Sequence, residues 1–167
     1  MIELWDAYLK TGELAGCDLI RGEVIPDGLY HLVSNIIVRH IDGSFLVMQR
    51  DYGKPNYPGM FEASAGGSAL KGERGYEAAL RELEEETGII ADNLKLVYKD
   101  VSNDTIYEGF LCVTDCDKDS IKLQAGETIS YRWLDEKEFL KFMESDLFVP
   151  PCRKRIKNFL GQIDNIR

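Results

Sequence analysis

Residues Gly66 to Ile89 read GGSALKGERGYEAALRELEEETGI and carry the strongest structural signal in the chain. The first ten residues of this stretch hold four glycines, and glycine lets a backbone pass close to a ligand or a metal ion without obstruction by a side chain. The residues that follow predict a helix from about Gly75 to Thr87, which Gly88 ends as the C-cap residue. The stretch is therefore read as a glycine-rich loop that leads into a helix.

The predicted helix carries two different faces. Three of its carboxylates, those of Glu82, Glu85 and Glu86, share an arc of about 100°, and the apolar face is formed by Tyr76, Ala79, Leu80 and Leu83. Like charges at this spacing repel, and the C-terminal end of a helix dipole also disfavours anions. A solvated acidic face is one interpretation. A hard divalent cation such as Mg²⁺, which prefers carboxylate oxygens, waters and phosphates, is the other.

The spacing of the whole stretch resembles the box of the Nudix hydrolases. Every fixed position is present: Gly67, five residues, Glu73, seven residues, Arg81-Glu82-Leu83, one residue, Glu85-Glu86, one residue, Gly88-Ile89. The resemblance implies an α/β/α sandwich with a mixed sheet. It also implies Mg²⁺- or Mn²⁺-dependent hydrolysis of a diphosphate linkage, in a nucleoside diphosphate derivative or a related small organic pyrophosphate.

The resemblance also implies roles for single residues of the box. Glu82, Glu85 and Glu86 resemble the metal ligands, and the Gly66 carbonyl is an additional candidate. Arg81 would orient the carboxylates, and the supporting residues of the box are Gly67, Glu73 and Gly88. The catalytic set expected from the sequence is Glu82, Glu85, Arg81 and Glu127. The proton acceptor is left open among Glu82, Glu127 and Glu108.

The remainder of the chain predicts a mixed sheet. Residues 31–40 and 44–50 read as a hairpin joined by a two-residue Asp42-Gly43 turn, and further strands are expected over residues 94–101, 105–113 and 128–134. Asp135 is a candidate N-cap of a second helix, and Pro150-Pro151 is expected to break the chain before a last helix that begins at Cys152. The expected fold is α/β, with helices on the faces of the sheet. Residues 1–29 would form a small N-terminal β extension, and residues 30–167 the Nudix domain.

Composition restricts the class of function. The chain has 167 residues, with 20 Lys and Arg against 29 Asp and Glu, and its net charge of −9 argues against binding to a nucleic-acid polymer. It shows neither a signal-peptide pattern nor a run of about 20 apolar residues, so we expect a cytoplasmic protein without a membrane span. The four cysteines (Cys17, Cys112, Cys116 and Cys152) lack metal-binding spacing and are expected to be reduced thiols. The resemblance adds the expectation of a homodimer.

The substrate is less well defined by the sequence. Arg50 and Lys54 are candidate phosphate contacts, and Tyr57 and Phe61 are candidates for stacking on a base. Residues 4–8, 28–31 and 58–67 resemble the Nudix subgroup that looks like isopentenyl-diphosphate isomerases, which makes an isomerase a rival interpretation. Those isomerases carry a catalytic Cys and a metal-binding His where this chain has Gly66 and Ser68. A non-catalytic nucleotide-binding module is a further alternative, which the complete box disfavours.

Overall fold

The computed structural model describes residues 1–163, and their side chains as far as Leu160. Residues 164–167 of the expected domain lie outside the described residues. The elements are β1 (Leu4–Tyr8), β2 (Leu14–Ile20), β3 (His31–His40), β4 (Phe45–Arg50), β5 (Phe61–Glu62), β6 (Ala65–Ser68), α1 (Gly75–Thr87), β7 (Lys95–Ser102), β8 (Thr105–Thr114), a 3₁₀ turn (Lys118–Ser120), β9 (Thr128–Leu134), α2 (Glu136–Met143) and α3 (Pro150–Ile163).

Seven of the strands form one mixed sheet. β3 lies near its centre and runs parallel to β8, while β6 and β7 pair antiparallel with β3 and β8 respectively. On the other side, β4 pairs antiparallel with both β5 and β9. β1 and β2 form a separate two-stranded antiparallel sheet, here called the N-terminal hairpin.

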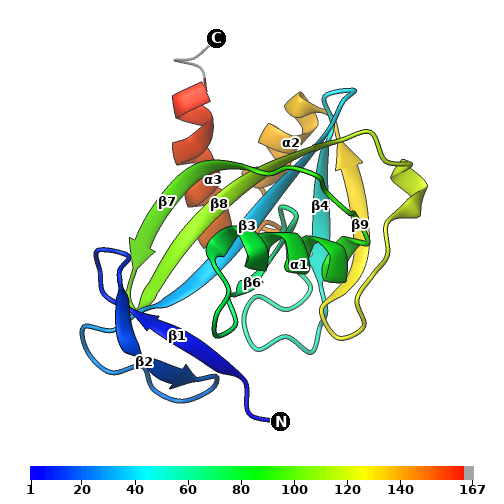
Figure 1. The fold of residues 1–167 in the computed structure, drawn as a ribbon. Coiled ribbons are helices and arrows are strands. Elements are labelled where there is room, and N and C mark those ends of the chain that lie inside the picture. Colours follow the sequence, from blue (N-terminus) through cyan, green and yellow to red (C-terminus); the bar gives the residue numbers. More distant parts are fainter. Residues whose placement is uncertain (164–167) are drawn as a thin grey trace.

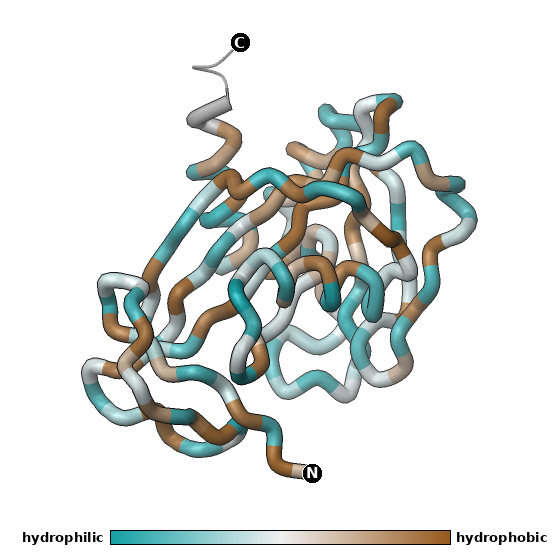
Figure 2. Tube along the Cα trace, viewed as in Figure 1, coloured by the Kyte–Doolittle hydropathy of each residue, from teal (hydrophilic) through white to brown (hydrophobic). Residues whose placement is uncertain are grey.

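Helices cover both faces of the large sheet (Figure 1), which confirms the predicted α/β/α layers. Alternate residues of β3 explain this arrangement, because successive side chains of a strand point to opposite faces. Ile36 belongs to the core cluster that includes Ala79 and Leu83 of α1, whereas Ile37 belongs to the cluster that includes Phe139 of α2 and residues of α3. Figure 2 shows hydrophobic and hydrophilic residues interspersed along the trace, and the buried apolar residues of β1 and β2 form a separate cluster that includes Trp5, Ala7 and Leu19.

Helix α1 has the predicted bounds. Gly88 follows it at φ 74° and donates its N–H to the Glu84 carbonyl, so the helix ends in the left-handed conformation that glycine favours. At the start, the Glu77 carboxylate accepts the Arg74 N–H at 2.6 Å. The Ser34 hydroxyl of β3 donates to the Gly75 carbonyl at 2.7 Å. The first two contacts cap the ends of α1, and the third attaches its start to the sheet.

The N-terminal hairpin packs against the glycine-rich loop that precedes α1. The Lys71 N–H donates to the Leu4 carbonyl at 2.9 Å, and the Gly72 N–H donates to the Asp6 carboxylate at 2.7 Å. Tyr8 forms a further bridge to Tyr30, just before β3. The extension is therefore attached to the loop as well as to the sheet.

Three sequence predictions are corrected. The β3–β4 connection is a three-residue loop, because His40 N–H donates to the Ser44 carbonyl and Gly43 adopts φ 93°, the geometry of a hairpin with a glycine bulge. β3 and β4 share one registered pair only, Arg39 with Phe45, since β4 pairs mainly with β9. Pro150 begins α3 instead of preceding it, because a proline at a helix start has no N–H to leave unsatisfied.

Candidate active site

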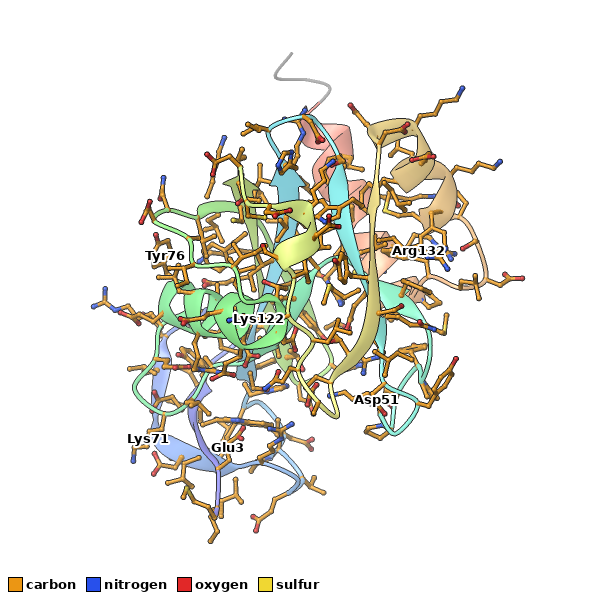
Figure 3. All side chains as sticks on the ribbon, turned by 90° about the vertical axis from the view of Figure 1, so that its right-hand side faces the viewer. Glu3, Asp51, Lys71, Tyr76, Lys122 and Arg132 are labelled. Carbon is orange, nitrogen blue, oxygen red and sulfur yellow. The ribbon has the colours of Figure 1, made fainter. Side chains whose placement is uncertain are left out.

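The glycine-rich loop, α1 and the N-terminal hairpin surround a cavity of about 350 Å³. Its walls are formed by Glu3, Arg21, Lys54, Gly66, Gly67, Ser68, Leu70, Arg81, Glu82, Glu85, Glu86, Gln124 and Glu127. In Figure 3, Glu3 of the hairpin region and Asp51 of the loop after β4 lie below α1, on opposite sides. The cavity is lined by the N-terminal hairpin region, the loop after β4, the glycine-rich loop, α1 and the segment before β9.

Three carboxylates of α1, those of Glu82, Glu85 and Glu86, lie in this cavity but differ in exposure. Glu86 is 8% exposed, and its Oε2 accepts the Gly66 N–H at 3.1 Å. The Glu82 side chain is 13% exposed, whereas that of Glu85 is 44% exposed. The exposure of these carboxylates therefore increases from Glu86, buried beside the β6 backbone, through Glu82 to Glu85, which is open to solvent.

Arg81 connects these carboxylates to the glycine-rich loop. Its Nη1 lies 2.7 Å from Glu82 Oε1 and 3.3 Å from Glu85 Oε2. Its Nε and Nη2 bind the two oxygens of Glu73 at 2.8 and 2.9 Å, and Nη2 also donates to the Ser68 carbonyl. Glu73 accepts the Leu70 N–H as well. One guanidinium therefore sets the position of two cavity carboxylates relative to the loop.

Gly67 is required by the close approach of β6 to Glu82. A Cβ added to Gly67 would lie 2.3 Å from Glu82 Oε1, well inside any ordinary contact distance. The Glu82 carboxylate therefore occupies the space that a side chain at residue 67 would fill. This contact gives a physical reason for a glycine at that position of the motif.

The cavity is electrostatically unfavourable to its own carboxylates. Burial raises the pKa of Glu86 well above its ordinary value, and the charges of Glu62 and Glu82 raise it further. Burial is also the main cause of the raised pKa of Glu82, which Arg81 partly offsets, while Glu85 and Glu127 add repulsion. Negative charge is thus concentrated here beyond what Arg81 neutralises.

The candidate proton acceptors are separated by the structure. Glu127 lines the cavity, and its carboxylate pairs with the Lys54 ammonium. Glu108 is not among the residues that line the cavity; it lies on β8, with Lys99 at 2.9 Å, and its carboxylate occupies the space beside Gly75. The structure therefore brings together Glu82 and Glu127 but not Glu108.

The four candidate substrate contacts lie in different parts of the structure. Lys54 lines the cavity, whereas Arg50 binds Glu62 at 2.6 Å and the Asn56 carbonyl at 3.1 Å. Tyr57 lines a different cavity, next to α3. Phe61 is 2% exposed and packs edge-on against Phe142, so the expectation that it stacks on a base is wrong: its ring is part of the core.

Residues that the sequence did not single out complete the walls. Glu3 and Arg21 come from the two ends of the N-terminal hairpin, and Gln124 comes from the segment before β9. Their sequence surroundings carry no motif, because their place in the cavity depends on how the hairpin and the β8–β9 connection pack. Only the tertiary structure identifies them.

Three further findings concern the described residues in general. Within residues 1–163, no group of three His, Cys, Asp or Glu side chains is already arranged to hold a metal ion. In the same part of the chain, no helix combines the length and the apolar character needed to cross a membrane. The four cysteines are free, and Cys112 and Cys152 are buried.

Comparisons with known proteins agree with the geometry. The model of the NUDIX domain matches residues 29–151. An uncharacterized Nudix hydrolase of Listeria monocytogenes is 32% identical and aligns over 99% of this chain and 96% of its own length. An isopentenyl-diphosphate Delta-isomerase of Rhizobium rhizogenes is 26% identical over 75% of this chain and 65% of its own. The crystal structure of DR0079 from Deinococcus radiodurans has a TM-score of 0.72 at 19% identity, covering 88% of this chain and 92% of that one.

Proposed function

This chain belongs to the Nudix family, and on that premise we propose that it is a metal-dependent hydrolase that cleaves a diphosphate linkage in a small organic molecule by attack of water on phosphorus. One observation carries the proposal. Glu82, Glu85 and Glu86 lie in a single cavity beside Gly66 and Gly67, and Arg81 holds two of them in position. Nucleoside diphosphate derivatives and related organic pyrophosphates are the substrate class.

The donor set of the cavity fits a hard divalent cation, Mg²⁺ or Mn²⁺. Carboxylate oxygens are the ligands such ions prefer. Burial, and to a smaller extent neighbouring carboxylates, raises the pKa values of Glu82 and Glu86, and a bound cation would favour their charged forms. Mg²⁺ is commonly bound by one or two carboxylates together with substrate phosphates, so a finished protein cage is not required. We assign Glu82, Glu85, Glu86 and the Gly66 carbonyl to this role.

When bound, such a cation neutralises phosphate charge and lowers the pKa of water. The residues of the chain supply the other requirements. Arg81 keeps Glu82 and Glu85 from turning away, because its guanidinium also binds Glu73 on the loop. Lys54, at the cavity wall, can bind a phosphate oxygen in exchange for Glu127. Glu82 and Glu127 are the two cavity carboxylates that can take the proton of the attacking water.

The rival reactions are less well supported. An isomerase of the isopentenyl-diphosphate type would need the Cys and His of that subgroup, and the cavity presents Gly66 and Ser68 instead. A purely nucleotide-binding module would not need the complete carboxylate set on α1. We therefore propose hydrolysis, within the isomerase-like subgroup.

A release assay tests the proposal. The purified chain is incubated with diphosphate-linked sugars, ADP-ribose, dinucleotides, nucleoside triphosphates and isoprenoid diphosphates, each with Mg²⁺, with Mn²⁺ and with a chelator. We expect cation-dependent formation of phosphate-containing products from at least one diphosphate. Product analysis separates hydrolysis from isomerisation, and the absence of cation-dependent release from every compound would contradict the proposal.

Two organisational proposals accompany the function. We propose that residues 1–29 form an extension and residues 30–167 the catalytic domain, which the start of the family match at residue 29 supports. We also propose a homodimer, by analogy with the family alone. Light scattering of the purified chain measures its mass, and a monomer at micromolar concentration would contradict the dimer.

A further inference from the structure

The two ends of the N-terminal hairpin meet at the wall of the cavity. Arg21 follows β2 and Glu3 precedes β1, and the Arg21 Nη1 lies 2.9 Å from Glu3 Oε2. The other oxygen of Glu3 accepts the Trp5 indole N–H at 2.8 Å, and the Trp5 ring is buried and stacks on His31 at 4.6 Å. Glu3 is therefore held by a fixed partner, whereas the Arg21 side chain is 59% exposed.

The hairpin is attached to the same loop that carries Gly66 and Gly67. Besides the two backbone contacts of Lys71 and Gly72, the Lys71 ammonium pairs with Asp18 of β2 at 2.6 Å (Figure 3 labels Glu3 and Lys71). This attachment fixes the distance between the hairpin and the carboxylates of α1. Arg21 thus lies at a defined place in the cavity wall.

The three cationic side chains of this wall differ in what they already bind. Arg81 is occupied by Glu73, Glu82, Glu85 and the Ser68 carbonyl, and the Lys54 ammonium is paired with Glu127. Among the described residues, Arg21 has one side-chain partner, Glu3, although a guanidinium has five N–H donors. Guanidinium groups also match the geometry of phosphate oxygens, often with two hydrogen bonds.

We propose that Arg21 is a phosphate-binding residue and that Glu3 competes with the substrate for it. When a diphosphate enters, the Arg21 guanidinium exchanges the Glu3 carboxylate for phosphate oxygens that the cation does not hold. The N-terminal hairpin would then take part in selecting substrates with two adjacent phosphates. This inference rests on the proposed function, since it concerns the substrate of the same cavity.

Removing each member of the pair has opposite expected effects. Arg21→Gln should weaken binding of the diphosphate at least tenfold, whereas Glu3→Gln should strengthen it severalfold, because the Gln carbonyl still accepts from Trp5 but no longer holds Arg21 as an anion. The double variant should bind no more tightly than Arg21→Gln alone. Arg21→Lys, which keeps the charge and loses the planar fork, should lie in between.

Calorimetric titration of the full chain with methylenediphosphonate in the presence of Mg²⁺ measures these affinities, since its P–C–P bridge resists hydrolysis. Asp18→Asn and Lys71→Gln are controls of matched charge, because they change the other ion pair of the hairpin, whose side chains lie outside the cavity. Equal dissociation constants for the wild type and Arg21→Gln would overturn the inference. So would equal weakening by Lys71→Gln, which would indicate a general charge effect.

Turnover measurements separate this inference from the proposed function. If the probe binds in an Arg21-dependent way but no diphosphate is hydrolysed, the proposed function alone is overturned. If a diphosphate is hydrolysed with the same KM by the wild type and by Arg21→Gln, the role of Arg21 alone is overturned. If the wild type neither binds the probe nor hydrolyses any diphosphate, both fall.

Discussion

Gly67 and Glu82 occupy adjoining space, so closely that a Cβ on Gly67 would lie 2.3 Å from the Glu82 Oε1 atom. The two residues come from different elements, a strand and a helix, and the Arg81 Nη1 binds the same Oε1 atom at 2.7 Å. A side chain at residue 67 would therefore displace the same oxygen atom that Arg81 binds. This arrangement leads to the first prediction.

Gly67→Ala should impair turnover more than folding. The methyl group displaces a flexible carboxylate end and leaves the apolar core intact, so the circular dichroism spectrum should be unchanged. Displacement of a reacting or ligating group by about 1 Å costs about 100-fold in rate. We expect a loss of kcat of that order, measured on whichever diphosphate the release assay identifies. Full activity of this variant would show that the close approach is not needed.

Substitution should distinguish the cavity carboxylates Glu85 and Glu86 from their exposed neighbour Glu84. Glu85→Gln and Glu86→Gln are each expected to reduce turnover by about two orders of magnitude or more, because a bound cation contributes several kcal/mol of charge stabilisation. Glu84→Gln is the matched control, since Glu84 is exposed on the same helix and does not line the cavity. Unchanged turnover in both cavity variants would refute the metal-ligand assignment.

Glu82 should be a more important proton acceptor than Glu127. The Glu127 carboxylate already has the Lys54 ammonium as its partner, whereas burial raises the pKa of Glu82, and a raised pKa makes a carboxylate a stronger base. Loss of a general base costs about 100-fold or more, so we expect that loss for Glu82→Gln and a smaller one for Glu127→Gln. Rates are compared at saturating Mg²⁺, so that weaker cation binding is not the cause. A larger loss in Glu127→Gln would reverse the assignment.

Cation-free protein should become less stable as the pH rises. The pKa of Glu86 is raised in the folded state, so folding favours its protonated form. The resulting stabilisation is complete below the ordinary pKa of a glutamic acid and is lost as the pH rises through the raised value. Urea unfolding in a chelator should therefore show a smaller free energy of unfolding at pH 8 than at pH 5.

Two comparisons test the origin of that pH dependence. Glu86→Gln should flatten it and should increase stability at pH 8, because the neutral amide avoids the buried charge. Added Mg²⁺ at 100 times its dissociation constant should stabilise the wild type by about 2.7 kcal/mol at pH 8. A Glu86→Gln variant that keeps the full pH dependence would exclude Glu86 as its source.

Local patterns in the sequence predicted the elements that depend on local chemistry. The bounds of α1 follow from Gly88 at its end, and α2 begins after Asp135, whose carboxylate accepts the Glu138 N–H at 2.8 Å. Helix capping involves residues three or four apart, so the sequence contains the whole interaction. Strand pairing, by contrast, can join residues far apart in the chain. β4 pairs mainly with β9 and only at one registered pair with β3, so the predicted hairpin is largely absent.

Helical periodicity and the box spacing are properties of consecutive residues, so the positions of Glu82, Glu85 and Glu86 on one side of a helix beside a glycine-rich loop were predictable. The folded chain was needed to show that Glu3 and Arg21 form part of the same cavity, that Glu108 lies elsewhere and that Phe61 is buried in the core. These features could not be predicted because burial and electrostatic environment depend on which segments pack together. The same three glutamates therefore share a motif but differ in exposure, from 8% for Glu86 to 44% for the Glu85 side chain.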